Sequence, residues 1–158
     1  MKSQVSLVRQ SIATVTQALS ESDIKVTQRG TQAYVEYDSL SGRPLRVNLP
    51  LVSDEAPEEL IEAVQGYLDH EVGHLLHTDQ REYLMGQREW QTLSVDGRVC
   101  RFLKSIHNII EDIHVERAQE RRFAGSRHNL SVVRRYLIDH LTRPKVQQQP
   151  EEAESALI

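Results

Sequence analysis

The sequence predicts an α+β domain that is mainly helical, with a small antiparallel sheet near the N-terminus. Apolar residues recur at helical intervals over residues 4–20 and 98–122, whereas between residues 24 and 49 short runs alternate and are rich in β-branched and aromatic side chains. With 158 residues, 39% of them hydrophobic and 27% charged, the chain has the size and composition of one soluble globular domain. We therefore expect a single domain over residues 1–143.

The first part of the chain is expected to form one helix and three strands. Residues 4–20 carry apolar side chains on one side and polar side chains on the other, which is typical of an amphipathic helix. Strands are expected over residues 24–27, 33–37 and 45–49, with glycine-containing turn signals between them. These patterns indicate the antiparallel sheet.

The remaining chain is expected to be helical. Pro57 and the acidic residues after it favour a helix start, and residues 80–95 indicate a connector with helical pieces. A last helix from about Ser131 to Leu141 should stop at Pro144, and the tail 144–158 has too little apolar surface to become ordered. The long helix over 98–122 is expected to bury one side, formed by Val99, Phe102, Leu103, Ile106, Ile109, Ile110, Ile113 and Val115.

The most informative motif is His70-Glu71-Val72-Gly73-His74, an HExxH sequence within an apolar helical pattern. On a helix the two histidines are four residues apart, so both imidazoles project from one face, and Glu71 lies beside them. Two imidazoles and one carboxylate leave Zn²⁺ with an open fourth position for water, whose proton Glu71 would take as general base. The motif therefore predicts His70 and His74 as zinc ligands in a metallopeptidase site.

Composition narrows the other classes of function. There are 19 basic and 23 acidic residues, so the net charge of −4 argues against a nucleic-acid-binding domain. The single cysteine, Cys100, has no partner within the chain, which favours a reducing compartment. The N-terminus has no signal-peptide core and no stretch has the length of a membrane span. We expect a cytoplasmic protein without a membrane partner.

The third metal ligand is expected from the segment 107–117, which places carboxylates and histidines in an otherwise apolar helix. Such groups are unfavourable to bury unless they bind a metal or each other. Helical spacing separates them into two faces. One face carries Asn108, Asp112 and Glu116, and the other carries His107, Glu111 and His114.

These two motifs, HEVGHLLHTD and HNIIEDIHVER, followed by residues 123–130, resemble the N-terminal metallopeptidase region of the CobT-like, von Willebrand A domain-associated proteins of bacteria and phages. The resemblance covers roughly residues 25–135. It implies a zincin-like fold with Asp112 as third ligand and Glu116 or Asn108 supporting it. Glu111 is the alternative ligand, because gluzincins use a glutamate on a separate helix.

The resemblance also implies partners. CobT-like proteins continue into an acidic linker and a von Willebrand A domain and act beside an AAA+ ATPase, whereas these residues end at Ile158. Two hypotheses follow: a zinc metallopeptidase that cleaves a protein or peptide substrate, or a zinc-stabilised interaction module that binds such an ATPase or von Willebrand A partner. Among weaker candidates, Asp79 could orient a zinc ligand, and His77 is expected to support a zinc ligand or to lie at the surface. Tyr83, Tyr136 or one of the arginines could stabilise an oxyanion.

Overall fold

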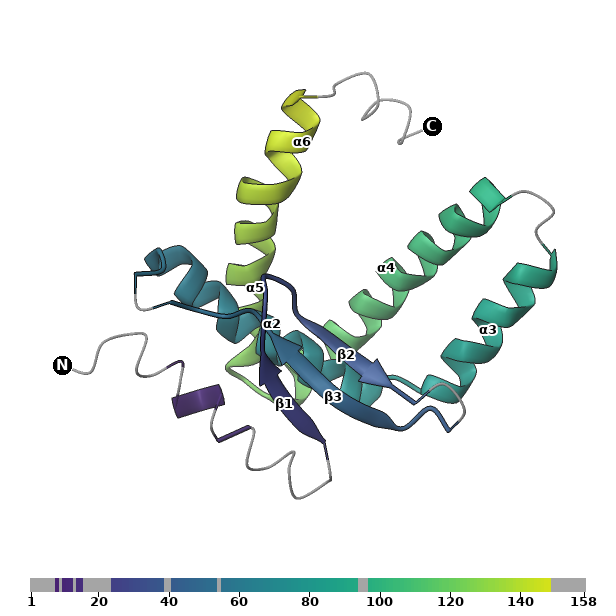
Figure 1. Ribbon diagram of the computed structural model, residues 1–158, viewed down its shortest axis with the longest axis horizontal. Helices are drawn as coiled ribbons and strands as arrows, with labels where there is room; N and C mark the ends of the chain where they lie inside the picture. The colour runs from purple at the N-terminus through teal and green to yellow at the C-terminus, as the bar shows by residue number, and fades with distance from the viewer. Residues whose placement is uncertain are drawn as a thin grey trace.

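The computed structural model describes residues 8, 10–12, 14–15, 24–38, 41–53, 55–93 and 97–148. The elements, shown in Figure 1, are the strands β1 (Lys25–Gln28), β2 (Tyr34–Tyr37) and β3 (Pro44–Leu49), the helices α2 (Glu58–His77), α3 (Gln80–Leu93), α4 (Gly97–Arg122) and α5 (Ser126–Leu137), the π-helical segment η1 (Ile138–Thr142), and α6 (Arg143–Gln148). The described parts of the expected N-terminal helix are helical. The α+β class is therefore confirmed. None of the helices described is both long and apolar enough to cross a membrane.

The sheet is mixed, so the prediction of an antiparallel sheet is wrong for one of its two strand pairs. The strand order is β1-β3-β2, with β3 parallel to β1 and antiparallel to β2. The chain after β1 passes across the end of β3 before it forms β2, and the buried side-chain amide of Asn48 donates hydrogen bonds to the carbonyls of Arg29 and Gln32 in this connection. Alternation identifies strands, but long-range contacts such as these decide which strands pair.

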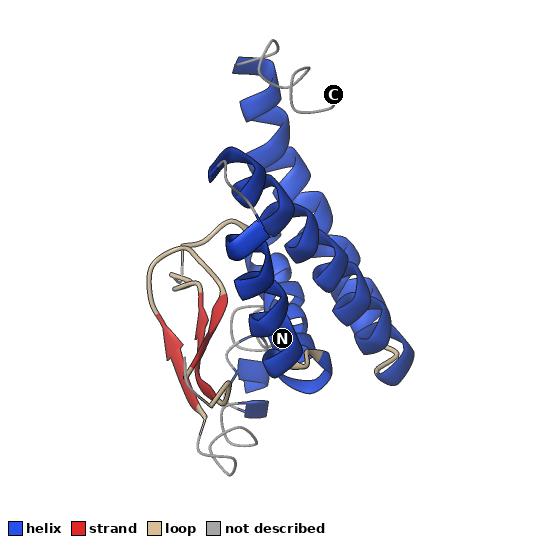
Figure 2. Ribbon diagram, turned by 90° about the vertical axis from the view of Figure 1, so that its right-hand side faces the viewer, coloured by secondary structure: helices blue, strands red, loops and turns tan. Residues whose placement is uncertain are grey.

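The sheet forms one layer and the helices cover one of its faces (Figure 2). Val47 and Leu49 of β3 are fully buried against Val64 and Leu68 of α2, and Val8 and Ile12 of the N-terminal segment join the same core. This core holds α2 at a fixed position on the sheet. Because α2 carries the HExxH motif, the core also fixes the motif's position.

Two glycines on α2 allow other helices to approach it closely. Gly66 faces the backbone of α5 at Asn129, where an added Cβ would collide with the carbonyl oxygen. At Gly73, within the HExxH motif, an added Cβ would lie 2.7 Å from Cγ1 of Val115 on α4. Both helices therefore pack directly on α2.

The buried side expected for α4 is mostly exposed. Val115 is fully buried, but Val99, Phe102 and Ile110 are among the large apolar side chains that remain open to solvent. Only the C-terminal half of α4 packs on α2, whereas its N-terminal half extends away beside α3 (Figure 1). The prediction that this face of α4 is buried is therefore wrong. Helical spacing identifies an apolar face but does not show whether another element covers it.

The last helix continues past its expected stop. Helical backbone runs from Ser126 through η1 to Gln148, so Pro144 does not end it. A π-helical turn directly precedes the proline and widens the helix where the ring would otherwise clash with the preceding turn. Residues 144–148 of the expected tail are thus helical, and its remainder lies outside the described residues.

Candidate metal centre

The structure brings His70, His74 and Asp112 together into a group that can hold a metal ion. The two histidines lie one turn apart on α2, with their Nε2 atoms 3.2 Å from each other. Asp112 comes from α4, and its Oδ1 lies 3.2 Å from Nε2 of His74 and 3.8 Å from Nε2 of His70. The contact between Gly73 and Val115 positions this carboxylate, because Val115 follows Asp112 by one helical turn.

The spacing of these three atoms fits a tetrahedral metal ion. With metal–ligand bonds of about 2.0 to 2.2 Å, as Zn²⁺ makes to nitrogen and carboxylate oxygen, ligand atoms in a tetrahedron are separated by about 3.3 to 3.6 Å. The observed separations of 3.2, 3.2 and 3.8 Å match one face of such a tetrahedron. No fourth side chain joins this group within the described part of the chain, which leaves the fourth vertex open.

The other ring nitrogen of His70 is held by Glu116. His70 Nδ1 donates to Oε1 of Glu116 at 3.2 Å, and Oε2 of Glu116 forms an ion pair with Nε of Arg134 on α5 at 3.2 Å. An ionised carboxylate can only accept, so the proton of neutral His70 belongs on Nδ1 and Nε2 keeps a lone pair that faces Asp112. This is the tautomer that metal binding requires.

His74 is oriented by two further residues. The hydroxyl of Thr78 donates to Oε1 of Glu111 at 2.6 Å and so presents its lone pairs to Nδ1 of His74, 3.0 Å away. Nδ1 of His74 is therefore the donor, and its Nε2 has a free lone pair toward the site. Thr78 was not among the site residues predicted from the sequence. Its position four residues after the second histidine, one helical turn away, is the signal that could have identified it as a partner of His74.

Glu111, proposed as an alternative metal ligand, is not in the ligand group that the described residues form. One residue along a helix turns a side chain by about 100°, so Glu111 points to the end of α2 when Asp112 points to the histidines. Its role in the structure is to hold Thr78.

Glu71 is a buried carboxylate beside the ligands, with 6% of its surface exposed. Burial raises the pKa of the Glu71 carboxyl above its usual range, against the effect of His70 and His74, which lower it. For His70, burial is the largest single influence and lowers the pKa, but the hydrogen bond to Glu116 and the nearby carboxylates outweigh it and raise the pKa. Glu71 is thus more basic than an exposed glutamate, and it is not one of the three side chains that form the metal-ligand group.

Glu71 and two of the ligand residues open into a cleft of about 630 Å³ between the sheet and the α3–α4 pair. Its walls come from strand β2 with the residue before it, and from helices α2, α3 and α4. The lining residues are Ala33, Tyr34, Val35, Tyr37, Glu71, His74, Thr78, Gln80, Tyr83, Leu84, Lys104, Asn108, Glu111 and Asp112. The site is therefore accessible to a molecule larger than water.

Tyr37 of β2 places a phenol in this cleft. Its hydroxyl is buried and has no hydrogen bond of ordinary geometry, although the side chain of Gln80 lies close to it. Burial raises the pKa of Tyr37 from 10.0 to about 12, and the charges of Glu71 and Glu111 act in the same direction. The phenol therefore stays protonated at neutral pH.

The weaker candidates lie in other positions. Asp79 does not orient a histidine; its Oδ1 accepts from the backbone N–H groups of Arg81 and Glu82 and so starts α3. Nε2 of His77 lies 3.3 Å from the side-chain oxygen of Gln119, outside the ligand group. The hydroxyl of Tyr83 donates to Asn108, also in the cleft, whereas Tyr136 stacks on His140 elsewhere.

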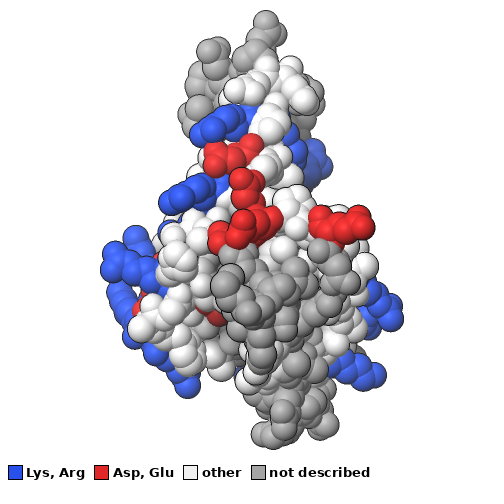
Figure 3. All heavy atoms as spheres, turned by 90° about the vertical axis from the view of Figure 1, so that its left-hand side faces the viewer, with Lys and Arg blue, Asp and Glu red and all other residues white. Residues whose placement is uncertain are grey.

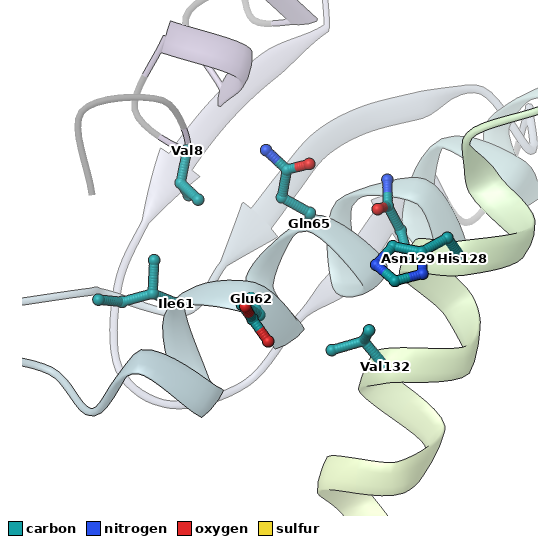
Figure 4. Close-up of a pocket in the computed structure, with 7 residues that line it drawn as sticks. All are labelled: Val8, Ile61, Glu62, Gln65, His128, Asn129 and Val132. Carbon is teal, nitrogen blue, oxygen red and sulfur yellow. The ribbon is translucent and has the colours of Figure 1, made fainter. Parts of the chain in front are cut away.

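Two further hollows lie on the opposite side of α2 from the cleft. One, of about 260 Å³, lies between α2 and α5 and is lined by apolar side chains together with Glu62, Gln65, His128 and Asn129 (Figure 4). The other, of about 400 Å³, is lined partly by Glu59, Glu62 and Asp139. Acidic side chains gather near the middle of the face seen in Figure 3, with basic side chains at its margins. Among the described residues, only the first cleft contains a metal-ligating group.

Comparison of the chain with protein-family models, with curated proteins and with solved structures finds no match. Function is therefore inferred from the site itself and from the motifs.

Proposed function

We propose that this protein is a zinc-dependent metallopeptidase of zincin-like architecture. The observation that carries this proposal is the ligand triangle of His70, His74 and Asp112 with a buried, non-ligand Glu71 beside it in an open cleft. A structural zinc site normally has four protein ligands, whereas a catalytic site has three and leaves one position open. The resemblance of the two motifs to CobT-like metallopeptidase domains supports the same activity.

Zinc is the metal that suits this donor set best. Two imidazoles and one carboxylate in a tetrahedral arrangement are typical of catalytic Zn²⁺ sites, and when bound the ion supplies a Lewis acid that polarises a carbonyl and makes water more acidic. His70 and His74 offer the lone pairs of their Nε2 atoms because their Nδ1 atoms are held by Glu116 and Thr78. Asp112 adds the negative charge that balances the cation.

Glu71 is the general base in this proposal. Its carboxylate accepts the proton of the attacking water while the water oxygen bonds to the peptide carbonyl carbon. The same proton then passes to the amide nitrogen as the carbon–nitrogen bond breaks, which gives a carboxylate and an amine. Burial favours the first transfer, because it makes Glu71 more basic than an exposed glutamate.

The walls of the cleft suit an extended peptide. Strand β2 is at an edge of the sheet and lines the cleft, so its outer backbone groups are available to pair with a substrate strand. Substrates are therefore expected to be unfolded segments or loops of proteins.

Zinc content of the purified protein is the first test. Elemental analysis should find one zinc per chain in wild type and in Glu111→Ala, and almost none in His74→Ala or Asp112→Ala. Absence of metal from folded wild-type protein, even after zinc is supplied, would contradict the proposal. Loss of zinc from Glu111→Ala but not from Asp112→Ala would reverse the assignment of the third ligand.

Activity is tested separately with Glu71→Gln. This variant should keep its zinc but cleave a denatured-protein or peptide-library substrate at least about 100-fold more slowly. If zinc is bound but wild type and Glu71→Gln act alike in every assay of function, the zinc serves structure and the protein is an interaction module.

A further inference from the structure

Helix α4 carries an exposed apolar stripe on the side that faces away from the metal centre. Five residues follow one another at intervals of three and four along the helix, and Ile110 lies beside them. The five are Val99, Phe102, Ile106, Ile109 and Ile113. Together with Ile110 they are called the α4 stripe below.

All six side chains of the α4 stripe are open to solvent. Their exposed fractions range from 37% for Ile106 to 60% for Phe102. The same helix buries Val115 completely where it meets α2. The exposure therefore belongs to one side of α4 and not to the whole helix.

The sides of α4 that contact the rest of the domain are different ones. Asp112 and Val115 face α2, and His107 stacks on Tyr83 of α3 with ring centroids 4.6 Å apart. The α4 stripe lies on the remaining side, and the N-terminal half of α4 extends away from α2 and α5 (Figure 1). Another molecule could cover the stripe without closing the cleft.

The spacing of the stripe indicates that a helix covers it. Intervals of three and four residues, repeated over two heptads, are the pattern by which two helices pack side by side as knobs into holes. Between Val99 and Ile110 the stripe and its flanking residues Leu103 and Ser105 are all uncharged. A second copy of the same surface would therefore meet no like-charge repulsion there.

The area of the stripe suits a symmetric pair. With at most roughly 200 Å² for each large apolar side chain and about half of it exposed, the six residues expose at most roughly 600 Å² per copy. Two copies would remove at most roughly 1,200 Å² from water, which is the lower limit for specific interfaces. Two-fold pairing of identical surfaces is also the commonest form of association.

We propose that the α4 stripe is a homodimer interface in which α4 of one copy packs against α4 of a second copy. Because the interface is small, the dimer forms at high protein concentration and dissociates into monomers on dilution. It leaves the cleft of each copy open, because the cleft lies on another side of α4. This proposal does not depend on the proposed peptidase activity.

Sedimentation equilibrium of the whole chain tests the interface. From about 1 to about 300 µM, the mass of wild type should rise from monomer toward dimer. Ile109→Glu and Phe102→Glu, both at exposed positions, should stay monomeric over the same range. Ile138→Glu is the matched control: it changes a side chain that is 51% exposed and lies outside the stripe, and it should dimerise like wild type. Circular dichroism should show that each variant keeps its helices.

A second measurement places the two copies. Cys100 is the only cysteine and lies on α4 next to the stripe, so a spin label there should report an intermolecular distance of roughly 15 to 30 Å in the dimer. A monomeric wild type at every concentration would overturn the proposal. So would a dimer that survives both stripe variants, or one whose labels are farther apart than about 50 Å.

Discussion

The two halves of α4 both carry large apolar side chains but have different surroundings. In the C-terminal half, Val115 is fully buried against Gly73, and Asp112 meets the two histidines of α2. In the N-terminal half, Phe102 and Ile109 are 60% and 57% exposed. One half therefore builds the metal centre, and the other presents an apolar surface to solvent.

This difference shows that close packing and apolar character are separate properties of a helix. The C-terminal half packs because α2 has glycine where α4 crosses it, which lets the two backbones approach. The N-terminal half lies beyond that crossing and meets only α3 among the described elements. A side chain of α4 can therefore be positioned precisely beside the two histidines only where α4 crosses α2.

The largest expected effect comes from placing the same charge in each half. Val115→Asp buries an unpaired carboxylate and should lower the free energy of unfolding by about 4 kcal/mol or more. Ile109→Asp places the carboxylate where the side chain is 57% exposed and should change that free energy by about 0.5 kcal/mol or less. Urea unfolding of dilute, monomeric protein measures both. Equal losses would mean that the two halves are packed alike.

A smaller effect is expected from Gly73→Ala, which tests the crossing itself. The new methyl group would lie 2.7 Å from Val115, so α4 must shift, with a loss of about 1 to 3 kcal/mol in stability. The shift also moves Asp112 away from the histidines and should weaken metal binding about tenfold, as a chelator competition assay can measure.

Gly86→Ala is the matched control for that variant. Gly86 lies within α3 and an added Cβ there has no atom within 4 Å, so alanine should stabilise the helix by up to about 1 kcal/mol and leave metal binding unchanged. If Gly73→Ala behaves like Gly86→Ala, the close approach of α2 and α4 is not what positions the third ligand.

The smallest effect on stability is expected from Thr78→Val, which keeps the shape of the side chain and removes its hydroxyl. Nδ1 of His74 then loses its acceptor and the ring its orientation, so metal affinity should fall about 10-fold to 100-fold with little change in unfolding. Thr92→Val, which changes an exposed threonine on α3, should bind metal like wild type. Equal affinities for the two variants would remove Thr78 from the site.

The local parts of the fold and site could be predicted from the sequence. Alternation and helical spacing identified the three strands and the helix that carries His70 and His74, because these patterns depend on neighbours within a few residues. The second segment was also recognisable, since carboxylates within an apolar helix need a partner. Sequence spacing left Asp112 and Glu111 as alternatives, because the rotation of α4 toward α2 depends on their packing.

What the sequence by itself determined was the α+β class, the presence of two histidines on one face of a helix, and the segment that supplies the carboxylate. The tertiary structure alone decided the mixed strand order, the approach of Asp112 rather than Glu111 to the two histidines, the contact of Thr78 with His74, and the exposure of the N-terminal half of α4. The physical reason is range. Side-chain periodicity is fixed by backbone geometry over one or two turns, whereas pairing, ligand approach and burial depend on which distant surfaces pack together.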